Sequence, residues 1–182
     1  MKLKATLNKP CTVEERYNFI EKYYYKKKYV IEETDEAIQA FDMTPDEKLV
    51  GARELKYQEA NIKAKEYLES GEALFEFEEG KHVEATDGNI GKFTGYVVGY
   101  VTGQLQPTDT VVWTTKEDET VNLTQAQVAQ ILTGMGEVQA RVWAVQFPAY
   151  LRMIEEAETA EAVEAIVIDY NNFEVQEESE EE

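Results

Sequence analysis

The chain has 182 residues, of which 37 are acidic and 18 basic, so its net charge is −19. Such a charge repels phosphate, and neither bare nucleic acid nor an anionic membrane surface is expected as a partner. Apolar residues make up 43% of the sequence and favour a folded core, while the single cysteine, Cys11, excludes an internal disulfide and a cysteine-based zinc site. Without a long apolar run or a signal-peptide core, a soluble protein made in the cytoplasm is expected.

Residues 1–43 are expected to form a small, mostly helical subdomain. Weak alternation from Lys2 to Leu7 predicts a short strand. Thr12 and Glu15 have the spacing of a capping box, which predicts a helix to about Lys27. The apolar face of this helix is expected to consist of Val13, Tyr17, Ile20 and Tyr24.

The run from Lys22 to Tyr29 mixes lysines with tyrosines. One interpretation is a patch for nucleic acid or a lipid headgroup. The other is a helix C-terminus whose lysines meet the macrodipole while the tyrosines pack inward. The acidity of the rest of the chain favours the second interpretation.

Residues 29–33 favour a strand and residues 35–41 a short helix. Thr44, followed by proline and then Glu47, is the clearest helix start in the chain. This helix is expected to reach about Glu69. Because its apolar positions are sparse, residues 44–71 are interpreted as a spacer helix that is mostly exposed or becomes buried only against a partner.

Residues 72–173 are predicted to form a central α+β domain. Alternating residues predict one hairpin over 74–85 and a second over 110–123, with a helix between them that begins at Asp87. The simplest arrangement is a small, mainly antiparallel four-stranded sheet with the helix across one face.

Four glycines of the central helix recur every fourth residue and so share one face: Gly91, Gly95, Gly99 and Gly103. Each interior glycine costs roughly 0.5–1 kcal/mol relative to alanine, so the row needs a reason. Close packing of a strand or helix within the chain is the favoured reason, and a helix–helix interface between subunits is the alternative. The aromatic residues Phe93, Tyr96 and Tyr100, together with Trp113, are predicted to be core rather than a platform for stacking bases.

A second capping box at Thr124 begins a long helix that is expected to kink or restart near Pro148. Thr159 is expected to cap a last helix that reaches about Ile168. Residues 174–182 contain six acids and are expected to form a mobile acidic tail.

Few residues suggest chemistry. His82 is the only histidine, so it and Cys11 are expected to be structural, with no partner set for catalysis. The segment from Asp87 to Lys92 lacks a full phosphate-loop pattern. Four acidic residues crowd the first hairpin: Glu76, Glu78, Glu84 and Asp87. They could form a carboxylate pair or a calcium site, but a solvated face of the hairpin is the favoured interpretation. No catalytic, cofactor-binding or metal-binding residue is predicted.

Several motifs resemble a domain of unknown function that is common in tailed-phage and prophage genomes. They are an aromatic-x-aromatic strand with a Gly-x-His hairpin, a tryptophan strand, and a Leu-Thr pair opening the last long helix, found here at Phe75–Asp87, Val112–Trp113 and Val121–Ala126. The opening of the chain also looks like the head of such phage proteins, at Leu7–Pro10, Phe19–Ile20, Tyr29–Thr34 and Ala37–Ile38. The chain departs from the family pattern at Val83, where an aromatic is common, and in the turn over 116–119.

This family occurs at the ends of tail-fibre-like proteins and in short proteins encoded among tail genes. The resemblance therefore implies a non-enzymatic virion component or assembly factor, in the virion or in the host cytoplasm during assembly. Its implied partners are tail or fibre proteins and, in a homo-oligomer, further copies of the chain. The alternative hypothesis is an acidic inhibitor of a host nucleic-acid enzyme that mimics DNA.

Overall fold

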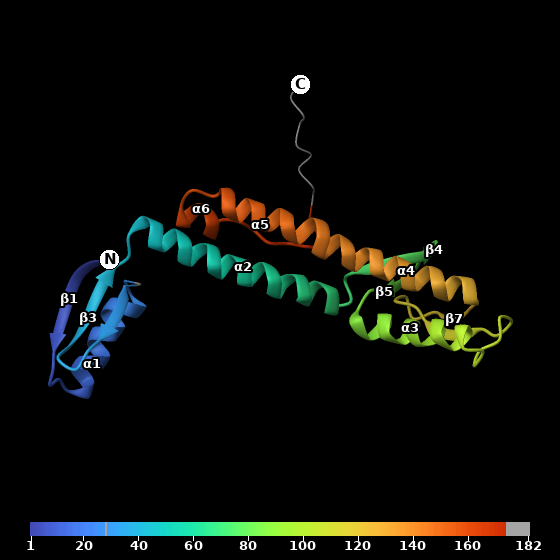
Figure 1. Cartoon of the computed structure of the whole chain (residues 1–182), viewed down its shortest axis with the longest axis horizontal. Helices are drawn as coiled ribbons and strands as arrows, with labels where there is room; N and C mark the ends of the chain where they lie inside the picture. Colours follow the sequence, from blue (N-terminus) through green and yellow to red (C-terminus); the bar gives the residue numbers. More distant parts are fainter. Residues whose placement is uncertain (28, 174–182) are drawn as a thin grey trace, which may run out of the picture. The chain divides into compact units, whose positions relative to one another are not determined.

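The computed structural model describes residues 1–27 and 29–173, and its fold is α+β (Figure 1). The chain divides into two compact units. The first comprises Met1–Lys56 with Ala157–Ala165, and the second comprises Tyr57–Glu156 with the residues from Ile166 onward. The expected acidic tail, at 174–182, lies outside the described residues.

The first unit contains a three-stranded antiparallel sheet in the order β1 (Lys2–Asn8), β3 (Ala37–Asp42), β2 (Val30–Glu33). The predicted helix over 35–41 is wrong, because this segment is the central strand β3. Pairing on both sides and burial of Ile38 and Ala40 outweigh the helix propensity of its alanines. The subdomain is therefore not mostly helical.

Helix α1 (Val13–Ile20) begins at the predicted capping box, in which both reciprocal bonds between Thr12 and Glu15 form. A π-helical turn, η1 (Glu21–Tyr25), continues it. The predicted apolar face is wrong: Val13 is 87% exposed, Tyr17 and Tyr24 are also exposed, and Ile20 is half-buried. Aromatic contacts form instead along Phe19, Tyr23 and Tyr29, with ring centroids 4.7 and 6.1 Å apart.

Helix α2 (Pro45–Glu69) has the predicted bounds and the predicted cap, since Thr44 Oγ1 accepts from the Glu47 N–H. Its buried residues are Ala60, Ala64 and Leu68, spaced four apart on one face within the second unit. The chain leaves the helix through Gly71, whose φ of +80° is in the left-handed region that glycine tolerates.

The second unit contains two hairpins. One is β4 (Leu74–Glu78) with β5 (Lys81–Glu84), and the other is β6 (Val111–Thr114) with β7 (Thr120–Leu123). They are two separate two-stranded sheets, so the four-stranded sheet is a wrong prediction. One backbone hydrogen bond links them, from Lys116 N–H to the His82 carbonyl at 2.9 Å, and it lies beyond the end of β6. The strands themselves do not pair.

Helix α3 (Asp87–Val101) has Thr86 as its N-cap. It packs through its aromatic face, where Phe93 and Tyr100 are buried. Of the four glycines in the row, only Gly99 is buried, and the predicted close packing within the chain is confined to that position. A Cβ added at Gly91 or Gly95 would meet nothing within 4 Å, and Gly103 follows the helix with φ +75°. Gly99 alone of the four lies against a side chain, that of Leu105.

The close approach occurs instead on α4 (Gln125–Arg141), where a Cβ at Gly134 would overlap the Phe75 ring. A π-helical turn, η2 (Val142–Gln146), separates α4 from α5 (Phe147–Glu156). It ends two residues before Pro148, whose missing N–H and ring disturb an α-helical ladder, so the predicted end and restart is found just upstream of the proline. Helix α6 (Ala160–Glu164) begins after Thr159 and is shorter than predicted.

The core of the second unit is formed by α2, both hairpins, α3, α4, η2, α5 and the segment 166–173. This segment has no helix or strand and is anchored by side chains. The Tyr170 hydroxyl donates to the Ala60 carbonyl at 3.0 Å, and the Tyr150 hydroxyl donates to the Asp169 carbonyl at 2.9 Å. The largest fully buried side chains of the unit are Phe93, Leu123, Ile131, Met135, Ile154, Val83, Val128 and Val142.

Candidate binding groove

An open cavity of about 700 Å³ lies in the second unit between β5, α3 and β6. We call it the hairpin groove. It exists because the two hairpins are not joined into one sheet. The edge of β6 that faces away from β7 is therefore left uncovered. The lining residues are Val83, Glu84, Asn89, Lys92, Tyr96, Val112, Trp113, Thr114, Thr115, Lys116 and Asp118.

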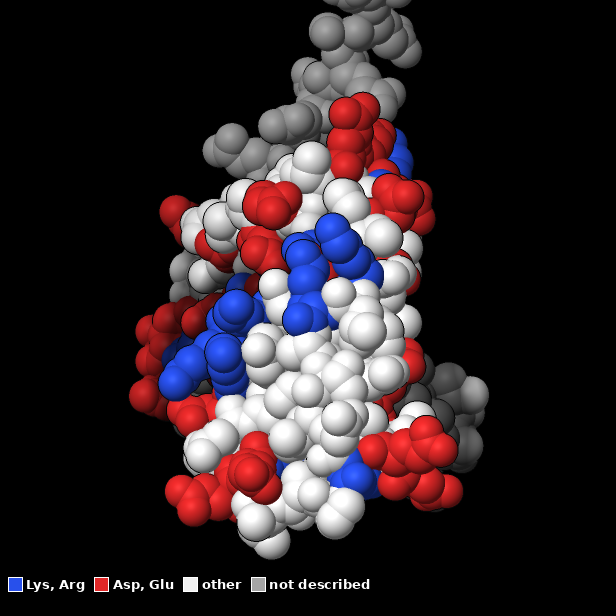
Figure 2. Space-filling model, turned by 90° about the vertical axis from the view of Figure 1, so that its left-hand side faces the viewer, with Lys and Arg blue, Asp and Glu red and all other residues white. Residues whose placement is uncertain are grey.

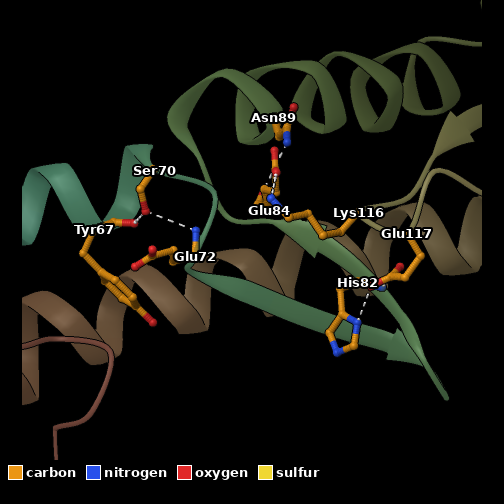
Figure 3. Close-up of polar contacts among 8 residues, drawn as sticks. All are labelled: Tyr67, Ser70, Glu72, His82, Glu84, Asn89, Lys116 and Glu117. Atoms are coloured by element: carbon orange, nitrogen blue, oxygen red, sulfur yellow. Dashed lines mark hydrogen bonds and ion pairs between the residues drawn. The ribbon is translucent and has the colours of Figure 1, made fainter.

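A polar clamp joins the hairpins beside the groove. The Glu117 carboxylate accepts from the His82 backbone N–H at 3.1 Å and contacts His82 Nδ1 at 2.8 Å (Figure 3). Hydrogen bonding from that backbone N–H is the main reason that the pKa of Glu117 falls to about 2. The only histidine of the chain is therefore held by a carboxylate and does not line the groove.

An ion pair crosses the groove, with Lys116 Nζ 2.6 Å from Glu84 Oε1 (Figure 3). This hydrogen bond raises the pKa of Lys116. The Glu84 backbone carbonyl accepts from the Asn89 side-chain amide at 3.1 Å, which ties the start of α3 to the end of β5. Glu84 thus fixes two elements of the wall, one through its side chain and one through its backbone.

The other wall is aromatic. Trp113 packs edge-on against the buried Phe93, with ring centroids 4.7 Å apart, and Tyr96 packs against the same ring at 5.7 Å. Lys92 Nζ lies 5.5 Å from the Trp113 ring centroid and 3.4 Å from Asn89 Oδ1. Trp113 is half-buried, so one predicted core residue also forms part of an accessible surface.

The other sequence-predicted residues lie elsewhere. None of the four glycines is among the lining residues, and Cys11 is half-buried in the first unit. Glu76 accepts from the Gly80 N–H, and Glu78 pairs with Lys81 at 3.1 Å, both on the exposed face of the first hairpin. Over residues 1–27 and 29–173, no three His, Cys, Asp or Glu residues are grouped so as to hold a metal ion.

Sequence reasoning missed Asn89 and Lys92 as groove residues, although it noted the segment that contains them. Their i, i+3 spacing places both on one side of α3, which was the available signal. Glu84 appeared only as a member of an acidic cluster, and Lys116 only as a turn residue. Their ion pair depends on how the two hairpins approach each other, which no local pattern reveals.

The first unit has a different exposed surface, on α1 and η1. Tyr24 and Tyr25 are exposed, so the prediction that the tyrosines pack inward holds only in part, for Tyr23 and Tyr29. Lys22 Nζ lies 5.0 Å from the centroid of the Tyr23 ring. On the face drawn in Figure 2, Lys and Arg side chains gather in groups beside an uncharged surface, with Asp and Glu mostly around it.

Residues 51–171 match a family described as a domain of unknown function, DUF4376. The chain belongs to this family. The DUF4376 match begins within α2 and ends in the segment after α6, so it includes every residue of the hairpin groove. No curated protein and no solved structure matches the chain. Within the part of the chain that is described, no helix has the length and apolar character needed to cross a membrane.

Proposed function

We propose that this DUF4376 protein is a non-enzymatic bacteriophage protein associated with the tail or its fibres, either a virion component or an assembly factor. The proposal rests on the motifs that the chain shares with tail-region phage proteins. On this proposal it acts through contacts with other proteins, and the hairpin groove is the surface that makes them.

The observation that carries a binding role is the way the groove is built. The Glu84 carboxylate is engaged by Lys116, and the Asn89 amide is engaged by the backbone of the neighbouring strand. Polar groups held in this way recognise a ligand at fixed positions, while the Trp113 and Tyr96 rings add apolar contact area. This combination of fixed polar groups and aromatic area suits a protein partner.

Affinity capture tests this function. The tagged full chain is used to capture proteins from a lysate of phage-producing cells, and purified virions are searched for the chain by mass spectrometry. Tail or fibre polypeptides are the expected partners. Capture of a host nuclease without any tail polypeptide would contradict the proposal and support the DNA-mimic alternative.

Two variants show whether the groove is responsible. Trp113→Ala should weaken the capture because it removes part of the aromatic wall. Val101→Ser is the matched control, because Val101 is exposed at the end of α3 and does not line the groove. Circular dichroism of both variants checks that the fold is kept.

A further inference from the structure

We propose that the hairpin groove binds an extended peptide segment of a partner protein, which adds as a strand to the free edge of β6 and places an acidic side chain beside Lys92. The inference rests on the proposed function and names the chemistry of the partner. Three observations carry it: the register of β6, the register of β5 and the charge of the groove.

The register of the second hairpin leaves backbone groups of β6 unpaired. Thr115 N–H donates to the Glu119 carbonyl at 2.9 Å, so these two residues form a hydrogen-bonded pair. Hydrogen-bonded pairs alternate along an antiparallel ladder, so Val112 and Thr114 direct their N–H and C=O groups away from β7. Among residues 1–27 and 29–173 these groups have no hydrogen-bond partner. Both residues line the groove, so the free edge faces it.

The first hairpin has a matching edge. The Ala85 N–H donates to the Ala73 carbonyl at 2.7 Å, so Ala85 and Ala73 form a hydrogen-bonded pair. The His82 carbonyl instead accepts from the Lys116 N–H, which lies outside the ladder of β5 with β4. By the same alternation, Glu84 directs its backbone groups away from β4. Its carbonyl is taken by Asn89, and its N–H has no partner in the described part of the chain. Strand edges of both hairpins therefore lie at the groove, and the ligand that satisfies such edges is another extended backbone.

Charge identifies one side chain of the peptide. The groove has two lysines, and Lys116 is neutralised by Glu84. Lys92 has no carboxylate partner among the described residues; it contacts only the Trp113 ring and the Asn89 amide oxygen. In a chain of net charge −19, this cation is complementary to an Asp or Glu of the ligand. Because side chains alternate along a strand, the residue two positions away faces the same wall and is expected to be apolar, against Trp113 and Tyr96.

The probe is a displayed library of random heptapeptides, selected on the full chain. Enriched peptides should carry Asp or Glu two positions from an aliphatic or aromatic residue. One enriched sequence is then synthesised and titrated by tryptophan fluorescence in a Trp143→Phe background, where Trp113 is the only tryptophan left. Quenching or a spectral shift on binding reports contact with the groove.

The decisive variant is Val112→Pro. It removes an N–H that faces the groove but takes no part in the ladder with β7, a position at which proline is tolerated on an edge strand. Affinity should fall by about tenfold or more, whereas Val112→Thr, which keeps the backbone donor, should bind within about twofold of wild type. Lys92→Glu should weaken binding by about tenfold, and a peptide with Lys in place of its acidic residue should restore it.

Peptide chemistry gives a second measurement that does not depend on how Val112→Pro folds. Methylating alternate backbone amides of the peptide removes the donors of one strand edge at a time. One set of methylations should abolish binding and the other should leave it unchanged, because only one edge of the peptide pairs with β6. Equal effects of both sets would exclude strand addition.

Failure of the inference can be told apart from failure of the proposed function. If no peptide is enriched, or if Val112→Pro binds the selected peptide as wild type does, strand addition is overturned. If tail polypeptides are captured equally by wild type and Val112→Pro, the function stands without this site. If peptides bind as expected but no tail or fibre polypeptide is captured, the binding site stands and the tail association does not.

Discussion

At the scale of single residues, the contact between Gly134 and Phe75 has the clearest consequence. The Phe75 ring occupies the space that a β-carbon at Gly134 would need. Gly134→Ala should therefore lower the free energy of unfolding by about 1–3 kcal/mol through overpacking, despite the gain in helix propensity. A urea titration followed by circular dichroism measures the change.

Gly136, two residues further along α4, supplies the control, because nothing lies within 4 Å of an added β-carbon. Gly136→Ala should stabilise the protein by about 0.5–1 kcal/mol. Combining Gly134→Ala with Phe75→Leu should recover part of the loss, since a smaller side chain leaves room for the methyl group. Additive losses in the double variant would show that the ring is not the obstacle.

A substitution at Gly95 tests whether the glycine row of α3 is closely packed. The sequence predicts close packing there, whereas an added β-carbon meets open space. Gly95→Ala, inside α3, should therefore raise the free energy of unfolding by about 0.5–1 kcal/mol. Thermal unfolding at several protein concentrations is the measurement. A destabilised variant, most clearly one whose melting depends on concentration, would support the alternative of an interface between subunits.

Glu117 predicts a pH dependence. Its pKa is lowered from 4.5 to about 2 in the folded chain, chiefly by the backbone N–H of His82. The folded state therefore binds its proton less readily than the unfolded state, so the stabilisation is fully present above pH 4.5 and is lost as the pH falls toward 2. Wild type should be more stable than Glu117→Gln at pH 7, and the difference should shrink below pH 4.5.

The control for this titration is Glu119→Gln, in the same turn, because the Glu119 side chain forms no hydrogen bond with a described residue. At pH 7 its stability should lie within about 0.5 kcal/mol of that of wild type. A difference between wild type and Glu117→Gln that stays constant from pH 7 to pH 2 would contradict the assigned role of the carboxylate.

At the scale of elements, the segment 166–173 shows how side chains can hold a stretch without regular structure. Tyr170 is buried, and its ring lies 5.2 Å from that of Tyr150 and 6.2 Å from that of Tyr67. Burial raises the pKa of its hydroxyl, which donates to the Ala60 carbonyl of α2. This one side chain therefore links the segment to two helices.

Tyr170→Phe keeps the ring and removes the hydrogen bond, so it should cost about 0.5–1.5 kcal/mol. Asn171→Ala, at an exposed neighbour, should stay within about 0.5 kcal/mol of wild type. Chemical denaturation of the two variants compares them, and equal stability would show that the hydroxyl contributes nothing.

Helix starts could be predicted well because their signals are local. The side chains of Thr12, Thr44 and Thr124 each accept from the backbone N–H three residues later, as their sequence patterns indicate. Strand β3 could not be predicted in the same way, because its conformation is set by β1 and β2 on either side of it. The two hairpins were predictable from alternation, but their failure to join depends on long-range packing.

For the groove, too, the sequence indicates single residues through local signals but does not indicate the long-range packing that brings them together. Trp113 could be picked out as a large aromatic in a strand, and Asn89 and Lys92 could be noted beside a helix start. The cavity that brings them together exists only because β5 and β6 stay apart, and no local pattern states how far apart two hairpins lie. The unpaired edge of β6 became visible only with the hydrogen bond between Thr115 and Glu119.

At the scale of the whole molecule, the division into two units predicts separable folding. The three-stranded sheet, α1 and η1 belong wholly to the first unit. Removing residues 1–43 should therefore leave the core of the second unit intact, with the amide shifts of α3, α4 and both hairpins unchanged in two-dimensional NMR spectra. Widespread shifts in those elements would show that the second unit depends on the N-terminal sheet.

The free edge of β6 also bears on how the protein behaves when it is concentrated. An uncovered strand edge is a template on which a second copy can pair, the first step toward aggregation. The net charge of −19 opposes such an encounter by mutual repulsion, which acts over about 10 Å at 0.1 M salt and about 3 Å at 1 M. The acidic surface thus opposes pairing between copies of the chain. This repulsion is weakest in high salt, which screens the charges, and in acid, which neutralises the carboxylates.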